Sequence, residues 1–373
     1  MGSKGSKSGS GRQGSSTDKW VEKQKEGKLP PDVTLLLREN QSLKDKLLKG
    51  KGTEAAIVAA VKEVFERPAE IVLPRPPKAM GKGPEETAFL HISDLQMGKR
   101  TNTYDHVVAA KRIQLLAQKT VEITQMRRSA ATIKELVLVL GGDINEGENL
   151  FGSQPHHISI CLIDQATKQS PECLLSAVLY LLGYFQKIKI FCVPGNHGRN
   201  GRIGEPGMNE KTNWDRVTYR VLETMLLGSD ENPHSDIRKR IDMHVSDTFW
   251  NVARIYDWGV LNVHGNQVQG GFAGFPWYGA AKKVWGWIDS IPEAFDYITI
   301  GHFHTFAKVV LNHRILLANG TVESDNEYAQ EQLAACGHPC QRLAFFNAKH
   351  GLIADHQVFL ADREPQRKRV KKW

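Results

Sequence analysis

The segment Leu136-Val137-Leu138-Val139-Leu140-Gly141-Gly142-Asp143 is an apolar run that ends in two glycines and an aspartate. Such a run predicts a buried strand followed by a tight turn. Four further predicted strands also end in polar residues. They are Phe89–Ile92 before Asp94-Leu95-Gln96, Ile188–Val193 before Gly195-Asn196-His197, Val260–Val263 before His264-Gly265-Asn266, and Tyr297–Ile300 before Gly301-His302-Phe303-His304. Ligands of open α/β sheets sit at the carboxyl ends of strands, so we expect these side chains to meet in one crevice.

The order of the other predicted elements indicates an α/β (α+β) fold. Amphipathic helices are expected over residues 105–128, 171–186 and 214–227, between the first strands. From Lys308 onward the pattern changes to short alternating strands, over 308–311, 314–318, 342–347 and 352–360. The chain thus begins with βαβ units and ends in a meander. Two stacked mixed sheets with helices outside would accommodate both halves.

Composition divides the chain of 373 residues into four parts. Residues 1–30 are polar and of low complexity, which predicts a disordered basic tail. Residues 31–84 contain a predicted helical segment, 33–67, which could mediate self-association, and then a Pro-rich linker. The main domain is expected over residues 85–362, followed by a basic tail at 363–373. The sequence leaves the oligomeric state open.

The positive charge is concentrated at the two ends. Residues 1–28 hold seven basic and three acidic side chains, and residues 363–373 hold six and one. The tails therefore carry +4 and +5, and the net charge of +8 leaves the body at −1. Basic tails favour weak, salt-sensitive association with polyanions, so nucleic acid is a candidate partner through them; solvated ends are the alternative.

Other features favour a cytoplasmic protein without a membrane span. The five cysteines are odd in number and no secretory signal precedes them, which favours a reducing compartment. The longest apolar stretch, Leu174 to Phe185, is shorter than the ~20 residues that cross a bilayer. We expect it to form a buried helix.

The five motifs together offer enough oxygen and imidazole ligands for two metal ions. A two-metal hydrolytic site needs a carboxylate that bridges both ions, and Asp143 suits this role because the glycines before it let the backbone turn. The other ligands would divide between the ions, with Asp94, Gln96 and His304 on one and Asn196, His264 and His302 on the other. Two close cations would lower the pKa of a water molecule, and the resulting hydroxide would attack phosphorus.

Three further residues are candidates for the chemistry. The leaving alkoxide needs a proton, and His197, next to Asn196, has a suitable reach and intrinsic pKa. Glu146 could orient that imidazole, and Arg199 could bind a phosphate oxygen. Each of these two charges is equally well explained as a solvated loop residue.

These motifs resemble those of the calcineurin-like metallophosphoesterase superfamily over residues 86–360. The resemblance implies a four-layer αββα double-sheet sandwich, a dinuclear metal centre and hydrolysis of phosphoesters. It carries the family's proton donor onto His197, and its metal ligands onto Asp94, Asp143, Asn196, His264, His302 and His304. The stretch Val263 to Tyr278 is similar to stand-alone phosphoesterases of bacteriophage and prophage genomes. The Gly-Asn-His and Gly-His-x-His motifs are shared with DNA-repair exonucleases of the superfamily.

Two positions depart from the family pattern. The first motif of the family reads Asp-x-His, whereas this chain has Gln96, and Gly198 stands where the family has an acid after the third motif. A neutral amide oxygen at Gln96 favours Mn²⁺ or Mg²⁺ over Zn²⁺ for the first ion and weakens the case for Gln96 as a ligand. The ions expected for the centre are Mn²⁺, with Mg²⁺, Fe and Zn²⁺ as alternatives.

The sequence supports three hypotheses on function. The first is a phosphodiesterase or nuclease acting on nucleic acid, in which Phe272, Phe275, Trp277 and Tyr278 could stack on bases or could instead be core residues. The second is a phosphomonoesterase acting on a phosphoprotein or nucleotide, which the near-neutral body favours. The third is a non-catalytic metal-binding scaffold, which the departure at Gln96 favours.

Overall fold

A computed structural model of the chain describes residue 76 and residues 80–148, 150, 154–200, 212–228, 234–270, 275–324 and 338–362. The predicted tails, 1–30 and 363–373, and the predicted helical segment 33–67 lie outside the described residues. None of the helices within these ranges is long and apolar enough to cross a membrane.

The first of two sheets has six strands in the order β11-β10-β1-β2-β3-β4. They are β1 (Glu85–Ile92), β2 (Thr132–Leu140), β3 (Lys187–Cys192), β4 (Ile241–Val245), β10 (Cys340–Asn347) and β11 (Gly351–Phe359). The pairs from β1 to β4 are parallel, while β10 pairs antiparallel with both β1 and β11. Leu90 pairs with Leu138, which pairs with Ile190. The apolar runs therefore align in rows across the sheet.

Helices connect the parallel strands, as parallel pairing requires. They are α4 (His106–Arg127), η1 (Gln154–His157), α5 (Leu162–Asp164), η2 (Gln165–Gln169), α6 (Ser170–Leu182), α7 (Trp214–Leu227) and α8 (Ser235–Arg238). Helix α4 begins where Asp105 accepts the backbone N–H groups of Val107 and Val108. Helix α7 begins at its cap Asn213 and ends before Gly228, whose φ is 70°.

The second sheet has five strands in the order β5-β6-β7-β9-β8. They are β5 (Trp250–Ile255), β6 (Trp258–Val263), β7 (Tyr297–Ile300), β8 (Ala307–Leu311) and β9 (Arg314–Ala318). Helix α9 (Trp277–Ser290) joins β6 to β7. Its buried residues Ala280, Val284 and Trp287 follow the spacing of one helical face and belong to the same apolar cluster as Ile298 and Leu316 of the sheet.

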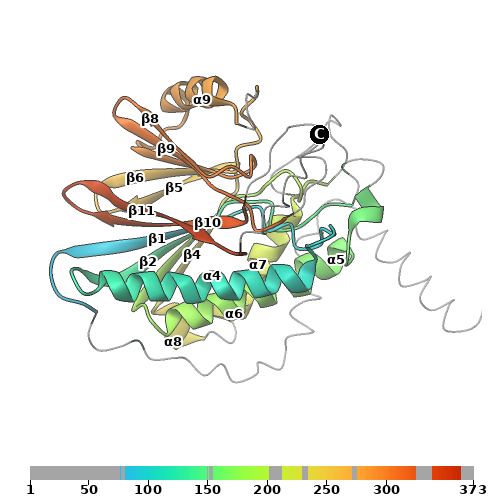
Figure 1. The fold of residues 1–373 in the computed structure, drawn as a ribbon, viewed down its shortest axis with the longest axis horizontal. Coiled ribbons are helices and arrows are strands. Elements are labelled where there is room, and N and C mark those ends of the chain that lie inside the picture. Colours follow the sequence, from blue (N-terminus) through green and yellow to red (C-terminus); the bar gives the residue numbers. More distant parts are fainter. Residues whose placement is uncertain are drawn as a thin grey trace, which may run out of the picture. The chain divides into compact units, whose positions relative to one another are not determined.

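Three apolar layers hold the elements together. Leu90 and Leu138 belong to the cluster that the first sheet shares with α4, α6 and α7, whereas Phe89 and Val137 point the other way, into a cluster with Val260 and other residues of the second sheet. A third cluster joins the second sheet to α9. Figure 1 shows α4, α6 and α8 along one outer face and α9 beyond the second sheet. The predicted αββα sandwich is confirmed.

Candidate metal centre

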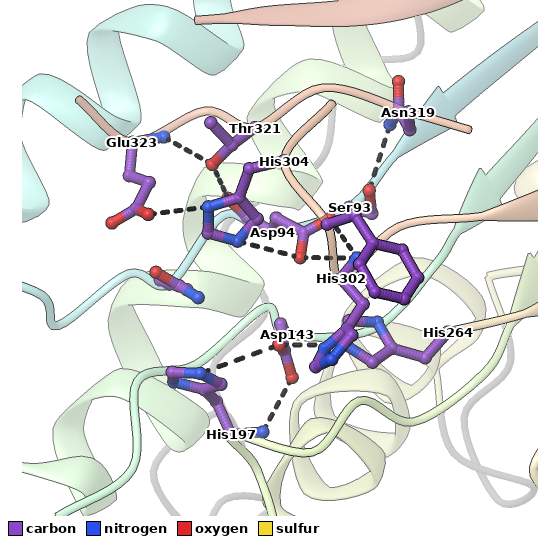
Figure 2. Close-up of polar contacts among 12 residues, drawn as sticks. Ser93, Asp94, Asp143, His197, His264, His302, His304, Asn319, Thr321 and Glu323 are labelled. Carbon is purple, nitrogen blue, oxygen red and sulfur yellow. Dashed lines mark hydrogen bonds and ion pairs between the residues drawn. The ribbon is translucent and has the colours of Figure 1, made fainter. Parts of the chain in front are cut away.

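Five loops bring the predicted ligands together, each at the carboxyl end of a strand. Those after β1, β2 and β3 of the first sheet supply the carboxylates and amides, Asp94, Gln96, Asp143 and Asn196. Those after β6 and β7 of the second sheet supply the imidazole ligands, His264, His302 and His304. Figure 2 shows Asp143 in the middle of the group, with His264 and His302 on one side and His197 on the other.

The backbone of these loops is strained in a way that ordinary turns avoid. Seven described residues other than glycine have positive φ, and five of them are predicted ligands: Asp94 (54°), Gln96 (43°), Asp143 (51°), His302 (67°) and His304 (54°). This conformation is costly for a residue with a Cβ, and it clusters at functional sites, where the surrounding structure enforces it. The strain therefore marks this crevice as a site independently of the motifs.

Glycines next to the ligands permit a close approach of the loops. A Cβ at Gly195 would lie 2.1 Å from Asp143 Oδ1, and one at Gly301 would lie 2.5 Å from Asp94 Oδ2. Any larger residue would push these carboxylates away. The glycines before Asn196 and His302 are thus required by the centre itself.

The tightest group is Asp143, His264 and His302, whose potential ligand atoms all lie within 4.8 Å of one another. His264 Nδ1 donates to the carbonyl oxygen of Gly141 across 2.9 Å, so Nε2 is left to face the site. That nitrogen lies 2.9 Å from Asp143 Oδ2 and 3.1 Å from Asn196 Oδ1. The predicted ligand set Asn196, His264 and His302 is therefore assembled against Asp143.

A second group lies on the other side of Asp94. His304 Nε2 is 3.3 Å from Asp94 Oδ1, and both oxygens of Asp94 accept the backbone N–H of His302, at 3.0 and 3.1 Å. Gln96 is buried, and its Oε1 accepts a hydrogen bond from Lys99 Nζ across 3.0 Å. The structure therefore brings Gln96 to the centre but gives its carbonyl oxygen a cationic partner.

The charges of the centre shift several pKa values. Burial alone would lower the pKa of His264, but Asp143 outweighs it and raises the pKa to about 9. Burial also opposes protonation of His304, yet Glu323 and Asp94 raise its pKa to about 10. Burial and the nearby His264 lower the pKa of His302 to about 3. The carboxylates of the centre thus favour positive charge next to them, which either protonated His264 and His304 or bound cations would supply.

His197 and Glu146 form a pair at the edge of the centre. His197 Nδ1 lies 2.9 Å from Glu146 Oε2, while its Nε2 lies 4.0 Å from Asp143 Oδ2. Glu146 is fixed in turn, because its Oε1 accepts from Gln154 Nε2 across 2.6 Å. Burial lowers the pKa of His197, but Glu146 and Asp143 outweigh it and raise the pKa above its usual value. The predicted contact between Glu146 and His197 is present.

Arg199 is half-buried in the loop after β3, and its Nε donates to the carbonyl oxygen of Asn196 across 2.8 Å. This bond ties the guanidinium to the ligand loop. The contact between Arg199 and a phosphate oxygen stays a prediction.

Three residues of the site carry no signal in the sequence. Asp215, in the first turn of α7, accepts the backbone N–H groups of Asp143 and Gly195, each across 2.9 Å. It therefore ties two ligand loops together, although in the sequence it resembles an ordinary first-turn acid. Glu323, after β9, lies 2.8 Å from His304 Nδ1 and forms an ion pair with Lys99. Only the folded chain brings Lys99 and Glu323 to the centre.

The residues present fit divalent cations. The donor set consists of carboxylate, amide and imidazole groups, which suit Mn²⁺, Mg²⁺, Fe and Zn²⁺. Asp143 Oδ2 is buried and lies 2.9 Å from His264 Nε2, a potential metal ligand, with no other hydrogen-bond partner among the described residues. A buried carboxylate oxygen beside an imidazole nitrogen is stabilised either by protonation of the imidazole or by a cation bound between the two groups.

The two mixed sheets with helices on their outer faces are the fold that the resemblance of the motifs implied. No family model and no curated protein matches its sequence. Among solved structures, vacuolar protein sorting 29 from Cryptosporidium parvum is 13% identical and has a TM-score of 0.35, with 74% of this chain and 99% of that chain covered. A novel archaeal phosphodiesterase is 11% identical, with a TM-score of 0.32 and coverage of 73% and 99%. Vps29 from Entamoeba histolytica complexed with Zn²⁺ is 10% identical, with a TM-score of 0.34 and coverage of 74% and 99%.

Proposed function

We propose that the protein is a hydrolase of phosphoesters that uses two divalent ions, preferably Mn²⁺, held at this centre. The observation that carries the proposal is the position of Asp143. Its buried Oδ2 lies 2.9 Å from His264 Nε2 and 4.0 Å from His197 Nε2, and it has no other hydrogen-bond partner among the described residues. We infer that this carboxylate would bridge two groups of ligands, with Asn196, His264 and His302 in one and Asp94, His304 and Gln96 in the other.

The bound ions would supply positive charge to the phosphate oxygens and would lower the pKa of a water molecule. The protein's own contribution begins with His197, which would give the leaving oxygen its proton from Nε2. Glu146 holds Nδ1 and so fixes both the orientation and the charge of the ring. Arg199, which lies beside the ligand loop, would contact a phosphate oxygen.

Within this class we favour phosphodiesters of nucleic acid as the substrate. The basic tails would raise the local concentration of a polyanion. A phosphomonoester of a protein or nucleotide is the alternative substrate. A specific contact favours a second candidate function, a metal-binding scaffold without turnover. This contact is the hydrogen bond from Lys99 to Gln96, which opposes a cation in the Asp94 group.

The test combines metal analysis with turnover. The purified protein, supplied with Mn²⁺, should hydrolyse bis(p-nitrophenyl) phosphate faster than p-nitrophenyl phosphate and should contain more than one ion per chain. Asp143→Asn should abolish turnover and reduce the metal content, because the bridging ligand loses its charge. Asp242→Asn, at a half-exposed carboxylate of β4 that pairs with His244, is the matched control. A metal-loaded protein that hydrolyses neither ester would support the scaffold instead.

A further inference from the structure

A groove runs along α9 on the outside of the second sheet. It encloses about 1040 Å³, and its lining includes Trp277, Tyr278, Lys282 and Lys283 of the helix. None of the described residues that line it is acidic. Both lysines are exposed, and neither forms an ion pair with another described residue. The groove therefore combines free positive charge with aromatic surface.

Two aromatic side chains of the groove contribute little to the core. Trp277 is 45% exposed and Tyr278 is 82% exposed, whereas Trp287, which also lines the groove, is buried with Val284 in the core of this layer. Large exposed aromatic groups are costly in water unless they serve recognition. Their position at the start of α9 places them next to the loop that follows β6.

Ring contacts link the groove to the metal centre. The ligand His302 packs against Phe303, with ring centroids 4.9 Å apart. Phe303 contacts Phe275 at 5.4 Å, and Phe275 contacts Trp277 at 4.6 Å. Phe275 is fully buried, so it supports Trp277 from below and does not itself meet a ligand.

The backbone links the groove to the centre as well. Gln269 and Gly270 line the groove and belong to the loop that begins with His264. A Cβ at Gly279 of α9 would lie 2.0 Å from the carbonyl oxygen of Gln269, so helix and loop pack without a gap. Helix α9 and the loop that carries His264 therefore pack as one unit.

We propose that this groove binds a single-stranded segment of nucleic acid and directs it to the metal centre. The proposal rests on the proposed phosphoesterase function and names its substrate class. Trp277 and Tyr278 offer faces on which unpaired bases can stack, and Lys282 and Lys283 neutralise the phosphates. A duplex offers no free base faces along its length, so the groove selects single strands.

Gly286 allows a sharp test. It lines the groove within α9, and a Cβ at this position would meet no atom within 4 Å. Gly286→Glu and Gly286→Gln therefore insert side chains of equal size into open space, and they differ only in charge. If phosphates bind here, the glutamate variant should bind a single strand severalfold more weakly than the glutamine variant.

Binding is measured by fluorescence anisotropy with the full-length, metal-loaded protein. The probe is a labelled oligothymidylate about 16 nucleotides long, the upper end of the range of known single-domain sites, with phosphorothioate linkages to slow hydrolysis. Tyr278→Ala should weaken binding about fivefold or more, as expected for one lost stacking partner. The same substitution should weaken binding of a duplex of equal length by a smaller factor, because the basic tails attract both probes but a duplex offers no free base to stack on Tyr278.

Equal affinities of Gly286→Glu and Gly286→Gln, together with no effect of Tyr278→Ala, would overturn the proposal. So would a Tyr278-dependent association with phosphatidylserine vesicles in place of the oligonucleotide. Hydrolysis of bis(p-nitrophenyl) phosphate reports on the centre separately. If the wild type does not turn over this ester but shows Tyr278-dependent binding of single strands, the phosphoesterase function fails and the groove stands.

Discussion

The ammonium group of Lys99 donates a hydrogen bond to the side-chain oxygen of Gln96 across 3.0 Å. Lys99 also forms an ion pair with Glu323, whose other oxygen lies 2.8 Å from His304 Nδ1. Where the metallophosphoesterase motif that the sequence resembles has a histidine, the chain has an amide, with a half-buried ammonium group beside it. The two proposed ion sites should differ in affinity, because only one of them competes with a fixed positive charge.

Lys99→Met should tighten binding of the second Mn²⁺ ion. Removal of the ammonium frees the Gln96 oxygen and takes away one of the positive charges that compensate Glu323 close to the Asp94 group. We expect the second dissociation constant to fall about tenfold or more, which corresponds to ~1.4 kcal/mol. Isothermal titration with Mn²⁺ measures it. Lys134→Met, at an exposed lysine of β2, is the control, and identical second constants in wild type and Lys99→Met would contradict the prediction.

Gln96→His should shift the metal preference toward Zn²⁺. An imidazole nitrogen is a softer ligand than an amide oxygen, and it cannot accept the lysine's hydrogen bond while it binds a metal. After equilibration with equal Mn²⁺ and Zn²⁺, elemental analysis should find a higher proportion of zinc in the variant than in the wild type. Gln96→Leu, which removes the ligand atom at similar size, should lower the content of both metals. If Gln96→Leu retains the wild-type content, Gln96 is not a ligand.

His197→Ala should slow turnover by about 10²–10⁴, the usual contribution of a general acid, while the metal content stays intact. The loss should be smallest for esters with acidic leaving groups, which depart without a proton. A series of aryl phosphodiesters of graded leaving-group pKa provides the measurement. An equal loss across the series would remove His197 from this role.

Glu146→Gln should change the pH dependence of the same reaction. The negative charge of Glu146 raises the pKa of His197, and a general acid must be protonated to act. Neutralising Glu146 lowers that pKa, so the alkaline limb of the pH–rate profile should move to lower pH. Glu148→Gln, at a neighbouring acid of the same loop, should leave this limb in place. A limb that moves equally in both variants would argue against the assigned pair.

The metal-free protein should lose stability as pH rises from about 6.5 to 10. The pKa values of His264 and His304 are raised to about 9 and about 10, so their protonated forms stabilise the fold below the unfolded value of 6.5 and lose this effect through the folded values. Thermal unfolding at several pH values with a chelator measures the slope. Saturating Mn²⁺ should flatten it, because bound imidazoles are neutral. Equal slopes with and without Mn²⁺ would contradict this.

Much of the fold could be predicted because its strands are short apolar runs bounded by turn residues. The predicted helix over 214–227 matches α7, and the predicted helix over 105–128 matches α4 to within one residue at each end. The helix predicted to reach Gln186 ends at Leu182, because Gly183 caps it. The sequence pattern could not show this end, since the apolar residues continue as far as Phe185.

In the candidate site, too, local sequence patterns predicted some of the residues but not others. Ligands that follow strands could be predicted, because the carboxyl ends of strands converge whatever the details of packing. Asp215 and Glu323 reach the centre from α7 and from the loop after β9, and no local pattern distinguishes them from other acids. Phe275, a predicted stacking candidate, is buried, and Phe272 lies outside the described residues. Of the two tryptophans two positions apart on α9, Trp287 is buried and Trp285 is exposed.

The division of the ligands between the sheets has a mechanical consequence. All predicted carboxylate and amide ligands follow strands of the six-stranded sheet and all predicted imidazole ligands follow strands of the five-stranded sheet, so an ion bound by both kinds of ligand would join the two sheets. A bound cation would therefore cross-link the two sheets. Its removal with a chelator should weaken the packing between the sheets, so that amide hydrogens of β6 and β7 exchange faster while those of α4 keep their protection.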